Sequence, residues 1–269
     1  MKRLSEPLRA AGASRPEFRR DLRPVVAGLA ALLLFGASGT IAAQRAGRGV
    51  PQTPRESAPI DLTGYWVSVV TEDWKLRMVT PARGVCDTLP LNAQGRRVGD
   101  AWDPARDEAA GEQCRAYGAG NIMRVPGRLH VTWQDAGTLR IDTDAGSQTR
   151  LLRFGPPTAP GGEATWQGQS AAQWQYAPGP RGGRRLGGLK VVTTNLRPGY
   201  VRKNGAPYSQ NAVVTEYFDV NTFPNGDVWL TVTVRVDDPT YFTRPYVTTS
   251  DFKKLPDATG WNPTPCVAR

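Results

Sequence analysis

Residues 127–154 read GRLHVTWQDAGTLRIDTDAGSQTRLLRF and contain the tripeptide Asp-Ala-Gly twice, at 135–137 and at 144–146. Each copy lies between runs in which apolar and polar residues alternate, as they do in a strand with one buried face. A three-residue loop that ends in Gly connects hairpin strands readily, because Gly adopts the left-handed backbone conformation without strain. The stretch therefore predicts two consecutive β-hairpins.

Three-residue loops at both turns fix which residues face each other across the strands. The first loop sets His130 opposite Asp142, and the second sets Arg140 opposite Arg150. With this register the apolar residues share one face, whereas a two-residue second loop would mix the two faces. The apolar face consists of Leu129, Val131, Trp133, Leu139, Ile141 and Leu151. The stretch thus predicts a sheet with one apolar and one polar face.

The rest of the chain predicts more short strands and one helical insertion. The strands are expected at 61–70, 74–79, around 166, 174–176, 189–196, 212–220, 228–236 and 241–249. The helical insertion is expected at about 91–115, with Asn92 as a cap and Asp103-Pro104 at the start of a second short helix. Residues 197–211 predict a long loop, and Asn225-Gly226 predicts a two-residue hairpin turn that sets Glu216 opposite Arg235.

Consecutive hairpins describe an up-and-down meander, and closing a meander into a barrel removes its exposed edges. The sequence therefore predicts a mainly β protein, a meander closed into a barrel of about eight to ten strands with a short helical insertion. A Greek-key sandwich is the alternative fold.

The first 43 residues have the composition of a secretory signal peptide. Basic residues precede an apolar run at 25–35, and the small residues Ala42 and Ala43 follow it. The general secretory route is expected, while Arg19-Arg20 leaves twin-arginine export open. Residues 44–59 predict a flexible lead-in, and 60–269 form the barrel domain. We expect a periplasmic or secreted protein with no stable membrane anchor after signal cleavage, because the apolar run is shorter than a bilayer span.

Cysteine and histidine usage bears on disulfides and metals. In an oxidising compartment we expect a Cys114–Cys266 disulfide that ties the C-terminal tail to the body, leaving Cys86 as a free thiol. One histidine and three scattered cysteines cannot build a standard zinc or iron site. The acidic residues between 100 and 112 lack the spacing of a calcium loop. The sequence predicts neither a metal site nor a cofactor.

Gly64-Tyr65-Trp66, at the head of the first predicted strand, resembles the Gly-x-Trp signature of lipocalins and their calycin relatives. The resemblance implies a barrel that holds a small apolar ligand. It also implies that Trp66 closes the base of the barrel beneath a late arginine. The helical insertion after the second strand departs from the pattern of that family.

The polar face of the two hairpins offers a possible catalytic group. A carboxylate at Asp142 would hold the imidazole of His130 in one tautomer and raise its basicity, as a general base requires. Arg140 and Arg150 on the same face could steady a developing negative charge. The alternative is that these four residues lie on the solvated outside of a barrel whose apolar face points inward.

Other residues could bind a ligand inside the barrel or at its rim. These candidates are Trp66, Trp133, Glu216, Tyr200, Tyr208 and Tyr241. Ordinary packing is the alternative for the aromatic residues, and a cross-strand ion pair with Arg235 is the alternative for Glu216. A nucleic-acid partner is not expected, because the arginines at 181, 184 and 185 have no aromatic residues between them.

These observations favour an exported barrel protein that binds a small apolar or aromatic molecule. A second hypothesis is a cofactor-independent lyase, isomerase or hydratase that uses His130 and Asp142 for acid/base chemistry. A third is a cell-envelope interaction protein that uses its Arg-rich lead-in and outer face against anionic surfaces. The net charge is +10 over the whole chain and +6 without residues 1–43, which leaves 27 Lys and Arg against 21 Asp and Glu. The sequence leaves the choice between binding protein and enzyme open, and it leaves the ligand and the oligomeric state open.

Overall fold

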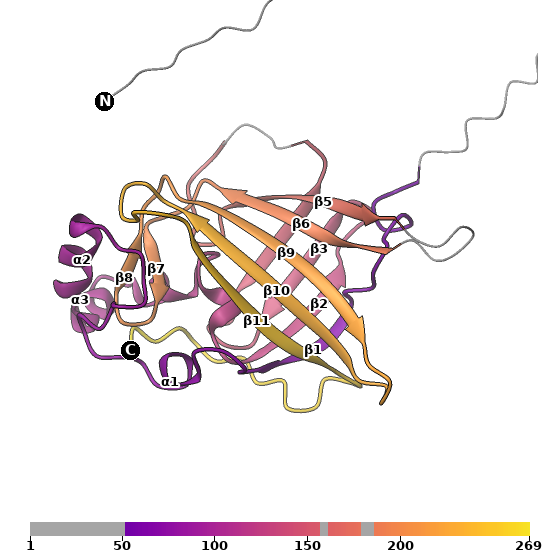
Figure 1. The fold of residues 1–269 in the computed structure, drawn as a ribbon, viewed down its shortest axis with the longest axis horizontal. Helices are drawn as coiled ribbons and strands as arrows, with labels where there is room; N and C mark the ends of the chain where they lie inside the picture. The colour runs from indigo at the N-terminus through magenta and orange to yellow at the C-terminus, as the bar shows by residue number, and fades with distance from the viewer. Residues whose placement is uncertain (1–51, 157–160, 179–185) are drawn as a thin grey trace, which may run out of the picture. The chain divides into compact units, whose positions relative to one another are not determined.

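The computed structural model describes residues 52–156, 161–178 and 186–269 (Figure 1). The predicted signal peptide and the first part of the lead-in lie outside these residues. Nine strands form a closed barrel: β1 (Gly64–Val69), β2 (Arg128–Trp133), β3 (Thr138–Thr143), β4 (Thr149–Phe154), β5 (Gln169–Ala177), β6 (Leu186–Thr194), β9 (Val213–Thr222), β10 (Val228–Asp237) and β11 (Tyr246–Leu255). The prediction of a closed, mainly β barrel is confirmed.

The strand order around the barrel is β1-β11-β10-β9-β6-β5-β4-β3-β2. Every neighbouring pair is antiparallel except β4 and β5, which run parallel. The barrel is therefore a meander with a single parallel junction, and closure leaves no strand edge for pairing with another chain.

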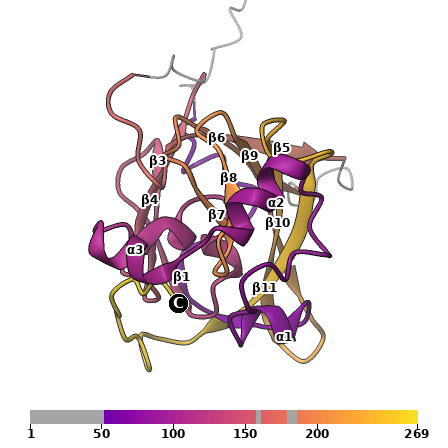
Figure 2. The same cartoon turned by 90° about the vertical axis from the view of Figure 1, so that its left-hand side faces the viewer.

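One end of the barrel, which we call the helical end, carries the helices and a small two-stranded sheet (Figure 2). The elements there are α1 (Trp74–Arg77), α2 (Ala93–Asp100), α3 (Pro104–Ala109), the 3₁₀ helices η1 (Gln113–Tyr117) and η2 (Ile122–Arg124), and strands β7 (Gly199–Arg202) and β8 (Ala206–Tyr208). The expected caps are confirmed: Asn92 accepts hydrogen bonds at the start of α2, and Asp103 does so at the start of α3. Among the described residues, no helix is long and apolar enough to cross a membrane.

Three predictions of secondary structure for individual segments were wrong. Residues 74–77 form the helical turn α1 rather than a strand, and Asp73 starts the turn with a left-handed φ of 48°. Residues 197–211, expected as a loop, contain β7 and β8. Trp166 lies outside the strands, and the strand expected near Trp174 is the longer β5. Each segment takes its structure from contacts at a barrel end, which a local pattern does not encode.

The opposite end, which we call the strap end, is covered by residues 52–59 of the predicted lead-in. Trp174 Nε1 donates a hydrogen bond to Pro54 O at 2.7 Å, and Arg55 N donates to Ala136 O at 3.2 Å. Beneath this strap, the rings of Trp133 and Trp174 lie 5.6 and 4.9 Å from that of Phe154. Segments of the chain therefore lie over both ends of the barrel, and a cavity of about 430 Å³ remains at the strap end beside Pro59 and Ile60.

The core lies inside the barrel, where the apolar face of the twin hairpins points. Leu129, Val131, Leu139 and Ile141 are each at most 3% exposed. The predicted Cys114–Cys266 disulfide is confirmed and joins the C-terminal tail to η1. Cys86 is free and buried.

The register of the second hairpin differs from the prediction by one residue. Arg140 lies opposite Leu151, and Ile141 lies opposite Arg150. Thr143 N donates a hydrogen bond to Gln148 O, so the turn contains four residues, 144–147. This slip turns Arg150 into the barrel and Leu151 away from it. The predicted pairing of Arg140 with Arg150 on one face is therefore wrong.

A second register error involves the hairpin at Asn225-Gly226. Its loop contains five residues, 223–227, so Glu216 lies opposite Val234, and Arg235 lies opposite Thr215. Glu216 points into the barrel, where Arg150 Nη1 and Nη2 donate hydrogen bonds to its carboxylate at 2.8 and 2.5 Å. Both side chains are 0% exposed. Arg150 on β4 and Glu216 on β9 both point inward, and each charge is neutralised by the other.

We predict that Glu216→Gln lowers the free energy of unfolding by roughly 3–5 kcal/mol, because the substitution leaves the buried guanidinium of Arg150 without a counter-charge. Urea unfolding followed by tryptophan fluorescence measures this change. The matched control is Asp237→Asn, which breaks an exposed pair with Arg235 at 2.7 Å and should have little effect. Equal losses in the two variants would contradict this account of the barrel core.

Candidate functional site

The four predicted catalytic residues are divided between the two faces of the barrel wall. His130 lies opposite Asp142 on the outer face, as predicted. However, Asp142 accepts two hydrogen bonds from Arg140, at 2.8 and 2.9 Å, and no hydrogen bond joins it to His130 among the described residues. The ring of His130 stacks instead on Tyr65, with centroids 4.1 Å apart. Arg150 lies inside the barrel, so the structure does not bring the four side chains together.

The charge on Asp142 is already neutralised by its neighbours. Partial burial would raise the pKa of this carboxyl group, but hydrogen bonds from Arg140 and Thr149 lower it below its ordinary value. A carboxylate held in this way is an ion-pair partner on the outer wall. It is not aimed at the imidazole, as the orienting group of a general base would be.

Two of the predicted ligand-binding residues, Trp66 and Trp133, lie toward the strap end. Trp66 is 0% exposed and donates a hydrogen bond through Nε1 to Leu62 O at 2.9 Å. The ammonium nitrogen of Lys254, from the last strand, lies 5.4 Å from the Trp66 ring centre. A late lysine therefore stands where the lipocalin resemblance implies a late arginine. Trp133 packs against Phe154 beneath the strap.

The three predicted tyrosines lie at the helical end but do not surround a common opening. Tyr208 is 0% exposed, and any side chain at Gly118 or Gly199 would clash with its phenol oxygen. Tyr241 is half-buried, and its backbone oxygen accepts a hydrogen bond from Asn92 N at 2.8 Å. Tyr208 is thus a core residue, and Tyr241 connects α2 to the loop before β11.

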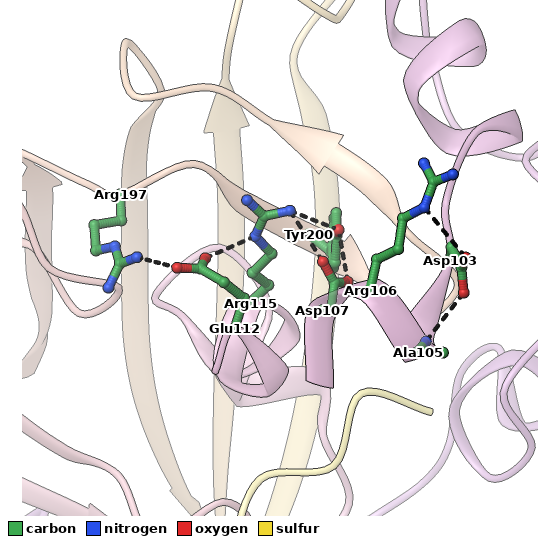
Figure 3. A network of polar contacts seen from close by, with 8 residues as sticks. All are labelled: Asp103, Ala105, Arg106, Asp107, Glu112, Arg115, Arg197 and Tyr200. Carbon is green, nitrogen blue, oxygen red and sulfur yellow. Dashed lines mark hydrogen bonds and ion pairs between the residues drawn. The ribbon is translucent and has the colours of Figure 1, made fainter. Parts of the chain in front are cut away.

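Tyr200 belongs to a polar network that joins α3, η1 and β7 (Figure 3). Its hydroxyl donates to Asp107 Oδ2 at 2.8 Å and accepts from Arg115 Nη1 at 3.1 Å. Arg115 also pairs with Glu112 at 2.9 Å, and Glu112 binds Arg197. Every charge in this network has a partner, so the network is a structural connection between elements of the helical end.

A different cluster at the helical end has charges without partners. Arg77, Arg124 and Arg202 come from α1, η2 and β7, and they are 8%, 4% and 4% exposed. They line a cavity of about 20 Å³, which we call the arginine cavity. Its full lining is Leu76, Arg77, Thr80, Asn121, Arg124, Val125, Pro126, Arg202 and Lys203. A volume of this size holds about one water molecule, or one oxygen of a larger polar group.

Arg77 is the residue with the most unused hydrogen-bonding capacity. Its Nε donates to Arg124 O at 2.9 Å, but no protein atom accepts from Nη1 or Nη2, and both nitrogens are buried. Burial and the neighbouring charge of Arg124 lower the pKa of Arg77. Arg77 forms no ion pair among the described residues.

The other two arginines are only partly satisfied. Arg124 pairs with Asp73 at 3.0 Å and donates to Thr248 Oγ1. Arg202 donates to Val85 O and to Thr88 Oγ1, at 3.3 and 2.8 Å, while its Nε has no acceptor. The carboxylates of Glu72, Asp73 and Asp251 act on the charge of Arg77, but none of them accepts a hydrogen bond from its two terminal nitrogens. Planar guanidinium groups suit the oxygens of a carboxylate or phosphate, so these free donors could bind an anion.

Reasoning from the sequence missed the arginine cavity because its residues are far apart along the chain. A local signal does exist: Arg77 lies between Leu76 and Met78, and Arg124 lies between Met123 and Val125. An arginine enclosed by apolar residues is a candidate for burial, and a buried arginine needs an anionic partner. Among the described residues, no group of three His, Cys, Asp or Glu side chains could hold a metal ion.

We predict that the Tyr200 network makes the protein less stable at high pH. Burial is the main reason that the pKa of Tyr200 rises from its ordinary value of 10 to about 12. In the unfolded chain the Tyr200 hydroxyl loses its proton near pH 10, whereas in the folded protein it keeps the proton until about pH 12. The contribution of Tyr200 to the free energy of unfolding is therefore fully present below pH 10 and decreases as the pH rises toward 12. Denaturant unfolding across this range should show a shallower decline for Tyr200→Phe than for the wild type. The same slope in both would contradict the prediction.

Comparison with protein-family models, with curated proteins and with solved structures found no match to this chain. The closed nine-stranded barrel is consistent with the lipocalin-like architecture that Gly64-Tyr65-Trp66 suggests. Evidence on function therefore comes from the geometry of the chain's own residues, and at the arginine cavity two terminal nitrogens of one buried cation have no acceptor in the described chain.

Proposed function

We propose that this protein is an exported binding barrel whose ligand carries an anionic group, a carboxylate or a phosphate, and that Arg77 binds this group in the arginine cavity. The observation that carries the proposal is the pair of buried Arg77 nitrogens, Nη1 and Nη2, for which the described protein offers no acceptor. A buried cation without a partner is costly, and an anion between the arginines would remove that cost.

The middle of the barrel gives less support for a ligand. Large side chains occupy it, and Trp66, Phe218, Phe252, Leu152 and Leu189 are each at most 1% exposed. The strap and the helical elements cover the two ends. The ligand expected from sequence was apolar and held inside the barrel. The geometry favours a ligand with a charged group that enters from the helical end, with Leu76, Val125 and Pro126 as its apolar contacts.

The proposal keeps a lipocalin-like binding protein as the class. The support for that class is the closed barrel, the fully buried Trp66 and the late cation over its ring. The proposed binding site differs from that of the class, because it is a polar cavity between elements of the helical end and not the interior of the barrel. An exported location, the small-molecule ligand and the absence of a nucleic-acid partner remain part of this proposal.

We predict that inorganic phosphate binds the wild-type protein and that Arg77→Gln weakens binding at least about tenfold, because a hydrogen bond to a charged group contributes about 1.5–3 kcal/mol. Isothermal titration calorimetry measures the affinity, and the phosphate-dependent rise in melting temperature checks it. The matched control is Arg235→Gln on the outer wall, which should bind phosphate as the wild type does. Failure of the wild type to bind either phosphate or acetate would overturn the proposal.

A second variant separates a binding role for Arg77 from a structural role. In phosphate-free buffer, we expect Arg77→Met to leave the free energy of unfolding unchanged or to raise it, because the substitution removes a buried charge that has no partner. The same variant should lose the stabilisation that phosphate gives. A large loss of stability without phosphate would show that Arg77 is a structural residue, and would argue against the proposed site.

A further inference from the structure

The outer face of α1 presents apolar side chains to solvent. Trp74, Met78 and Val79 are 59%, 60% and 66% exposed, and we call these three residues the α1 patch. Trp74 and Met78 are four residues apart and share one side of the helical turn. With Val85, this segment holds four of the ten large hydrophobic residues that are exposed in the described chain. Such a concentration within twelve residues indicates a contact surface.

The same segment forms one wall of the arginine cavity. Leu76, Arg77 and Thr80 line the cavity, while the α1 patch faces outward. The ammonium nitrogen of Lys75 lies 5.5 Å from the centre of the Trp74 ring. Exposed Trp beside Lys and Arg is a combination that suits the boundary between lipid headgroups and acyl chains.

The charge balance around the patch favours an anionic partner. Three carboxylates act on Arg77, those of Glu72, Asp73 and Asp251, and Asp73 is paired with Arg124. The basic side chains of α1 and of the cavity outnumber them, and they are Lys75, Arg77, Arg124, Arg202 and Lys203. Residues 44–269, which follow the predicted signal peptide, hold 27 Lys and Arg against 21 Asp and Glu, a net charge of +6.

We infer that the helical end docks on a bilayer containing anionic phospholipid, with the α1 patch among the headgroups and a lipid phosphate in the arginine cavity. This inference rests on the proposed function, because it names the source of the anion. Three side chains are too few for a stable protein interface, which needs about 800 Å² on each partner. A membrane requires less, because a few inserted side chains act together with about 1 kcal/mol for each nearby Lys or Arg.

The test is co-sedimentation of the full mature chain with vesicles. We expect binding to phosphatidylcholine vesicles with about 30% phosphatidylglycerol, weak binding to pure phosphatidylcholine, and release at raised salt. Trp74→Ala combined with Met78→Ala should weaken binding about tenfold, since two inserted side chains are lost, while phosphate binding stays as in the wild type. The control is Phe223→Ala at the strap end, where Phe223 is 48% exposed and should not matter.

The outcomes distinguish this inference from the proposed function. Phosphate binding without any vesicle binding would overturn the membrane inference and leave the anion site standing. No phosphate binding by the wild type would overturn both. Vesicle binding that depends on Phe223 and not on the α1 patch would overturn the inference, and so would vesicle binding that Arg77→Gln leaves unchanged.

Discussion

The ion pair between Arg150 and Glu216 is the interaction on which the rest of the barrel depends. Both side chains are 0% exposed, and they come from β4 and β9, on different parts of the barrel wall. Either residue alone inside the barrel would leave a buried charge without a partner, so each inward orientation requires the other. The pair thereby fixes the registers of two hairpins. Around it, Thr193 and Ser170 provide hydroxyl groups, and their oxygens lie 2.8 Å apart.

The registers of these two hairpins determine which charged side chains lie inside the barrel and which lie on its outer face. With Arg150 turned inward, Arg140 remains on the outer face and binds Asp142, so the carboxylate is no longer available to orient His130. The barrel middle is filled with large apolar side chains around one neutralised pair. The strap closes one end, and the helical elements, held by the Cys114–Cys266 disulfide, close the other. Among the buried cations of the described chain, Arg77 at the helical end is the one whose two terminal nitrogens both lack an acceptor.

Local patterns in the sequence predicted the barrel, the register of the first hairpin, the cap at Asn92, the start of a second helix at Asp103-Pro104 and the disulfide. They succeeded because each depends on neighbouring residues or on compartment chemistry. The register of the second Asp-Ala-Gly hairpin was wrong because the rule used for it places all apolar residues on one face, and Arg150 is an inward charge. The register at Asn225-Gly226 was wrong because a two-residue turn was expected where the loop contains residues 223–227. The α1 turn and the arginine cavity were missed for a related reason. Both are defined by elements that meet only in the folded chain.

Comparing the buried arginines gives the physical argument for function. Arg150 and Arg77 are both removed from water, and both would be costly if left alone. The fold supplies Arg150 with a carboxylate at 2.5 Å, so its energetic cost is met within the chain. Arg77 receives one backbone acceptor, while its two terminal nitrogens meet no protein acceptor. The difference between the two arginines is the physical ground for the anion-binding function that we propose, because an anion would supply Arg77 with the acceptors that Glu216 supplies to Arg150.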